Sequence, residues 1–91
     1  MLGDDDFVTD LELFDSMHYL VIATNNGRML VYKWDRKLPD EIKPMHEFRN
    51  HTKSITGLKK MTENRSYIVT SSLDGSIKIF CLEMMIELYS F

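Results

Sequence analysis

The sequence predicts an all-β protein built from two similar units, each with four antiparallel strands. The first observation is composition: the chain has one alanine, whereas Ile, Val, Thr, Phe, Tyr and Trp together number 27 of its 91 residues. β-Branched and aromatic side chains favour strands over helices. The second observation is an internal repeat. The third is a tight-turn dipeptide at the same place in each copy of that repeat.

The repeat relates residues 19–32 to residues 67–80 at a constant offset of 48. In each copy an aromatic residue opens an apolar run, a turn ending in glycine follows, and a second apolar run ends on an aromatic residue. Upstream, residues 8–11 match residues 55–58 at an offset of 47, and Met61 falls under Phe14. Two copies of one unit therefore fill nearly the whole chain.

In the first unit we expect strands at residues 7–14, 19–24, 29–33 and 43–48. The dipeptide Asn26-Gly27 accepts positive φ and closes a hairpin between the second and third strands. Pro44 lies in the fourth segment and has no amide hydrogen to donate to a neighbouring strand. The fourth strand is therefore expected at an edge of the sheet.

In the second unit we expect strands at residues 54–61, 67–72, 76–82 and 85–91, with Asp74-Gly75 closing the central hairpin. Residues 82–89 contain strong helix formers, but the repeat register predicts an outer strand there. Residues 29–32 and 67–69 are apolar on both faces, which is typical of strands covered from both sides. Each sheet is thus expected to be stacked against other sheets.

With this pattern, residues 7–91 resemble the WD-repeat β-propeller family, and the second unit matches best. Asn50-His51 stands where the family has its Gly-His pair, and residues 70–80 stand for its Ser-Gly-Ser-x-Asp-Gly-x-Ile-x-Leu-Trp stretch. The resemblance implies all-β blades of four antiparallel strands. Because propellers have about 4–8 blades, it also implies a partial propeller, completed by remaining blades of the same propeller or by another chain.

The resemblance implies a buried hydrogen-bond network in the second unit, with His51, Thr70 and Asp74 as members and Phe80 in the tryptophan position. Since phenylalanine has no N–H, the last link of the network is expected to be missing. Cys81 takes the place of the aspartate in the Trp-Asp pair. The dipeptide Trp34-Asp35 is not that pair, because the position equivalent to Phe80 is Tyr32.

The first unit departs further from the family pattern. Asn26 stands in place of the network aspartate, Ile22 in place of the hydroxyl residue, and Asp4 where the histidine would be. We therefore expect this unit to be held by packing alone. The predicted organisation is an acidic, solvated lead-in at residues 1–6, a first blade at 7–48 and a second blade at 49–91.

Charge and motifs argue against several classes of function. Residues 1–15 carry six acids and no Lys or Arg, and the remaining chain holds eleven bases against eight acids. That surplus is too thin for a nucleic-acid surface. The longest apolar run has five residues, which predicts no membrane partner.

We expect no metal, no cofactor and no catalytic site, because ligand spacings and nucleophile–base pairs are missing. A single cysteine and no secretory signal predict a cytoplasmic protein.

The predicted function is a non-catalytic scaffold for protein–protein contacts inside a multiprotein complex. A nucleic-acid-associated or enzyme-subunit role, with the propeller as an accessory domain, is the alternative. The long connection after residue 33 carries Trp34, Arg36 and Lys37, and Trp and Arg are enriched in interface hot spots. Arg49 and Lys53 flank His51 at the opposite rim and form a second candidate contact patch. Nothing in the residues selects a particular assembly, such as a ciliary or cytoskeletal one.

Overall fold

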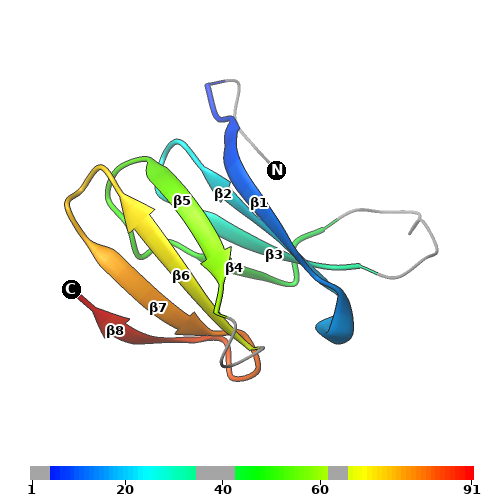
Figure 1. Cartoon of the computed structure of the whole chain (residues 1–91). Helices are drawn as coiled ribbons and strands as arrows, with labels where there is room; N and C mark the ends of the chain where they lie inside the picture. Colours follow the sequence, from blue (N-terminus) through cyan, green and yellow to red (C-terminus); the bar gives the residue numbers. More distant parts are fainter. Residues whose placement is uncertain (1–4, 35–42, 62–65) are drawn as a thin grey trace.

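The computed structural model describes residues 5–34, 43–61 and 66–91, which form two four-stranded antiparallel sheets side by side (Figure 1). Strands follow one another in chain order within each sheet. The first sheet contains β1 (Val8–Phe14), β2 (Tyr19–Thr24), β3 (Met29–Lys33) and β4 (His46–Phe48). The second contains β5 (Ile55–Lys60), β6 (Tyr67–Ser72), β7 (Ile77–Cys81) and β8 (Ile86–Ser90). The all-β prediction is confirmed.

The strands lie where the repeat predicts them, and the largest difference is at β4. This strand begins at His46, so Pro44 precedes it, and β4 is an edge strand as expected. The helix formers after Cys81 form a turn followed by β8, because pairing with β7 outweighs local propensity. Among the described residues, the one helical element is the short 3-10 turn Asp15–Met17, and no helix could cross a membrane.

The turns and irregularities repeat in both sheets. Gly27 and Gly75 adopt φ values of 85° and 88°, in the left-handed region that glycine enters without a Cβ clash. The pairing of β1 with β2 shifts register between Val8 and Asp10, and β5 with β6 shifts between Ile55 and Gly57. The two units therefore share their strand order, their central turns and this first irregularity, whereas the β7–β8 pairing has a further shift between Ile79 and Phe80.

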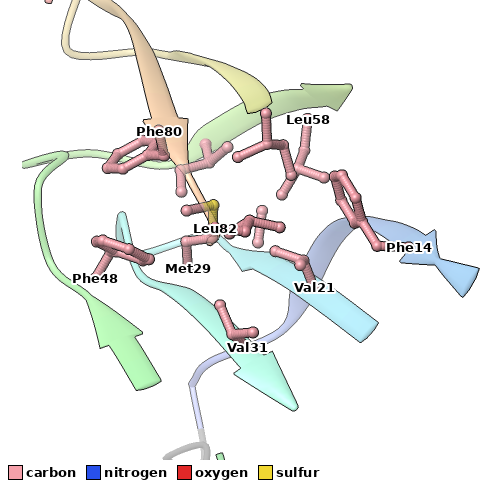
Figure 2. Packing of buried hydrophobic residues seen from close by; sticks show 11 residues of the cluster. Phe14, Val21, Met29, Val31, Phe48, Leu58, Phe80 and Leu82 are labelled. Atoms are coloured by element: carbon pink, nitrogen blue, oxygen red, sulfur yellow. The ribbon is translucent and has the colours of Figure 1, made fainter. Parts of the chain in front are cut away.

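The hydrophobic core lies between the two sheets (Figure 2). The first sheet contributes side chains such as Val21, Met29 and Val31, and the second contributes Ile68 and Phe80, all at most 1% exposed. Full burial of an apolar side chain of this size stabilises a fold by about 1.5–3 kcal/mol. The face of the first sheet that looks toward the second is therefore a core face.

Polar contacts between the sheets run from β1 to β5, which lie side by side. The amide N–H of Leu58 donates to Asp10 Oδ2 at 2.9 Å, and that of Lys60 donates to Glu12 Oε2 at 3.4 Å. Because β5 is the edge of its sheet, these amides face away from β6 and have no strand partner. The Asp10 and Glu12 carboxylates thus accept hydrogen bonds from amides at the edge of the neighbouring sheet.

Candidate functional site

His51 lies in the segment that joins the two sheets and is 5% exposed. Its Nδ1 is 3.0 Å from Asp74 Oδ2, and its Nε2 is 2.6 Å from Thr70 Oγ1. Since a carboxylate only accepts, the Nδ1–H donates to Asp74. Thr70 is buried on β6, whereas Asp74 lies in the β6–β7 turn and its side chain is 11% exposed. The structure thus brings together the three network residues named from the sequence.

Ser76 is a fourth member of this network. Its Oγ and its amide N–H both donate to Asp74 Oδ1, at 2.5 and 2.8 Å, and its Oγ lies 3.1 Å from His51 Nδ1. These bonds from Ser76, with those from Thr52 and His51, hold the pKa of Asp74 well below its ordinary range. Sequence reasoning missed Ser76, although a serine two residues after the aspartate of a tight turn is a usual donor to that carboxylate.

Asp74 makes folding stability dependent on acid pH. Its pKa in the unfolded chain is near 3.8 and lies lower in the folded chain, so its stabilising contribution is present above 3.8 and is lost as pH falls toward the folded value. We expect urea midpoints to decrease steeply below about pH 4. Asp74→Asn should flatten this part of the profile. An unchanged slope in that variant would show that other carboxylates carry the dependence.

Phe80, in the tryptophan position, takes no part in the hydrogen-bond network. Its side chain is 1% exposed, and its ring centroid lies 4.7 Å from that of Phe48 in a tilted arrangement. The aromatic position is thus used for packing between the sheets, as Figure 2 shows. Cys81 follows at the end of β7 and is buried.

The predicted contact residues lie at opposite ends of the sheets. Arg49 and Lys53 are exposed on either side of buried His51. Trp34 is 43% exposed at the far end of β3, where its amide donates to His18 O at 2.6 Å. Arg36 and Lys37 lie outside the described residues.

Residues 42–81 match the family model described as WD domain, G-beta repeat. This segment is therefore similar to a WD repeat. The match covers β5, β6 and β7 together with His51, Thr70 and Asp74 of the second unit. A search of the curated proteins found no match. Among the described residues, no group of three or more His, Cys, Asp or Glu side chains is placed to hold a metal ion.

The first unit has a polar network of its own, so the expectation of packing alone was wrong. Thr24 is fully buried, and its Oγ1 donates to Asn26 Oδ1 at 2.5 Å. Asn26 Nδ2 in turn donates to Asp6 Oδ1 at 2.8 Å. The hydroxyl comes from Thr24, two residues after Ile22, and the acid is Asp6. Asp4, which the alignment placed at the histidine position, lies outside the described residues.

Arg28 extends this network across the first sheet. Its guanidinium donates to Glu47 Oε1 at 2.5 and 3.0 Å and forms an ion pair with Asp6 at 3.3 Å. The Arg28 hydrogen bond is the main reason why the pKa of Glu47 is lowered, and Arg49 also donates to this carboxylate. The acidic lead-in is therefore not simply solvated, because the side chain of Asp6 bonds to Asn26 and Arg28 of the first unit.

Proposed function

We propose that this chain is a non-catalytic scaffold for protein–protein contacts, part of a WD-repeat propeller that works inside a cytoplasmic multiprotein assembly. WD repeats typically serve as protein-interaction modules. The observation that supports the proposal is that exposed Arg49 and Lys53 flank buried His51, whose hydrogen bonds fix the backbone between them.

The segment that presents these cations is held from several sides. His51 is tied to Asp74 and Thr70, and the amide of Thr52 donates to Asp74 Oδ2 at 3.0 Å. The Lys53 carbonyl accepts from Ser72 Oγ at 3.0 Å. A backbone fixed in this way loses little conformational entropy when its exposed side chains bind a partner. A patch fixed in this way, with Lys53 as a cation and Arg49 paired with Glu47, suits a small acidic site on a protein surface better than a run of phosphates.

Trp34 supports a second contact at the opposite end of the first sheet. An exposed tryptophan offers a large apolar surface with a polar N–H, the combination found in binding hot spots. In the proposal, Arg36 and Lys37 extend this contact along the chain.

The alternative, a nucleic-acid-associated role, has weaker support. Residues 49–91 hold six bases and four acids, and Arg49 is paired with Glu47. A phosphate-binding surface would need several uncompensated cations. The polar side chains at His51 are bonded to one another within the fold, which supports a structural role over a catalytic one.

The proposal predicts that partner binding can be removed without unfolding. In quantitative pull-downs from cell extract, Arg49→Ala/Lys53→Ala should weaken partner binding about thirtyfold, because the two contacts are worth around 1 kcal/mol each. Lys53→Arg, which keeps the charge, should retain the partner. Trp34→Ala tests the second contact, with Met84→Ala as a control that removes an exposed apolar side chain elsewhere.

The melting temperature of each variant separates contact from stability. Loss of the partner with unchanged melting supports a contact residue, whereas loss of melting temperature with intact binding contradicts it. Retention of the wild-type chain on heparin at physiological salt, without a protein partner, would favour the nucleic-acid alternative.

A further inference from the structure

Each sheet has two faces, and among the described residues most of the buried apolar side chains lie on the face of each sheet that meets the other. We define the forward face as the face that the first sheet turns toward the second. In the first sheet this face includes Phe14, Val21, Met29, Val31 and Phe48, none of them more than 6% exposed. The repeat therefore identifies which surface of the second sheet is built for the same kind of contact.

The forward face of the second sheet is largely apolar and only partly covered, and Lys59 lies on it beside Val69. By the offset and the strand register, its equivalents are Met61, Val69, Ile77, Ile79 and Phe91. Ile77 is 46% and Phe91 is 73% exposed. The hydrophobic surface that the first sheet buries is thus left open on the second.

The backward face, which the second sheet turns toward the first, shows the converse. Leu58, Ile68 and Phe80 are at most 2% exposed on the second sheet. Leu11 occupies the position equivalent to Leu58 on the first sheet and is 58% exposed, and Leu13 beside it is 37% exposed. Among the described residues, exposed apolar side chains therefore lie on the forward face of the second sheet and on the β1 part of the backward face of the first, where Leu30 on β3 is buried.

A hollow on the open forward face matches the exposed leucine on the open backward face. The hollow has a volume of about 520 Å³, and its lining includes Gly57, Met61, Val69 and Ser71. The equivalent positions in the first sheet surround the place where Leu58 packs, because Phe14, Val21 and Leu58 share one core cluster and the Leu58 amide reaches Asp10. If a second copy packs on the second sheet as the second sheet packs on the first, its Leu11 lies in this hollow.

Charge favours the same pairing. Residues 1–48 hold ten acids and five bases, a net charge of −5, whereas residues 49–91 hold four acids and six bases, a net charge of +2. Joining the second unit of one copy to the first unit of another places opposite net charges together. Joining two second units would place a forward face against a forward face. That pairing does not occur between the two sheets of one chain.

We propose that a second copy of this chain docks on the open forward face of the second sheet, with its Leu11 in the hollow beside Gly57. The contact is head-to-tail, so each copy uses both open faces. A closed ring results when the rotation from each sheet to the next adds up to a full turn. Since propellers close with about 4–8 blades, the ring contains two to four copies. This self-assembly is separate from the scaffold role and does not depend on it.

The test measures the mass of the full chain by sedimentation and light scattering as its concentration is raised. We expect a discrete species of two, three or four times the 10.7 kDa of the single chain. Leu11→Glu and Ile77→Glu should each abolish this species, because each places a carboxylate in one of the two faces. Leu73→Glu, at an apolar residue 66% exposed in a turn, is the control and should leave it intact.

Mixing the two variants distinguishes a head-to-tail contact from any other. Leu11→Glu keeps a working forward face and Ile77→Glu keeps a working backward face, so the mixture should form a heterodimer and nothing larger. Leu13→Glu and Phe91→Glu address the same faces if circular dichroism shows that a first variant has unfolded. A folded wild-type chain that stays monomeric, variants that leave the mass unchanged, or a mixture that stays monomeric would each overturn the proposal.

Discussion

Gly27→Ala is expected to destabilise the chain by about 3 kcal/mol or more, which lowers the melting temperature by about 12 °C or more in a domain of this size. Two effects combine. Gly27 has a φ of 85°, which costs an alanine about 1–2 kcal/mol. A Cβ there would also lie 2.8 Å from the carbonyl carbon of His51, closer still to its oxygen, and 2.9 Å from the Lys53 oxygen. These are backbone atoms of the neighbouring unit and cannot rotate away.

Gly75→Ala is the matched control for this prediction. Gly75 has nearly the same φ, at 88°, but a Cβ there would meet no atom within 4 Å. Thermal melts of both variants, followed by circular dichroism, therefore separate backbone strain from the clash. Gly75→Ala should therefore cost about 1–2 kcal/mol, the cost of the positive φ alone. Equal losses for the two variants would show that the approach of the β2–β3 turn to the His51 segment is not a source of stability.

His51→Ala is expected to cost about 2–4 kcal/mol, because it removes two hydrogen bonds and leaves a void in a buried position. Thr70 Oγ1 loses its 2.6 Å partner in a fully buried site, and Asp74 loses one of its donors. Urea unfolding curves at neutral pH give the free energy of unfolding. Thr70→Val, which keeps the shape of the side chain but removes the hydroxyl, should show part of the loss.

Asn26→Ala is the control for the network of the second unit. Asn26 is exposed, and its hydrogen bonds to Thr24 and Asp6 can be replaced by water. We expect it to cost about 1 kcal/mol or less. A loss equal to that of His51→Ala would mean that the first unit depends on its network as much as the second does.

The strand order and the central hairpins could be predicted from the sequence because their causes are local. Alternating or continuous apolar runs define strands, and Asn26-Gly27 and Asp74-Gly75 accept the positive φ that a tight hairpin needs. The repeat then extends these local signals to the whole chain. Even the helix formers after residue 81 could be assigned to a strand, since the register from the first unit overrides their propensity.

His51, Thr70 and Asp74 could be named in advance because the family resemblance assigns them by position, but their neighbours could not. Ser76 was missed in the second unit. In the first unit, the alignment placed Ile22 at the hydroxyl position and Asp4 at the histidine position, and it did not show that Thr24 and Asp6 bond to Asn26. An alignment compares positions along the chain, whereas the path of the backbone decides which side chains reach a turn.

The contacts between the two units depended on tertiary structure alone. Asp10 and Glu12 are ordinary acidic residues in the sequence, and nothing local shows that they accept hydrogen bonds from the amides of Leu58 and Lys60. The same holds for Gly27, whose turn reaches the carbonyl oxygens of His51 and Lys53. Sequence periodicity specifies which face of a strand is apolar. The twist of each sheet and the angle at which two sheets meet determine which distant atoms come within hydrogen-bond or van der Waals distance.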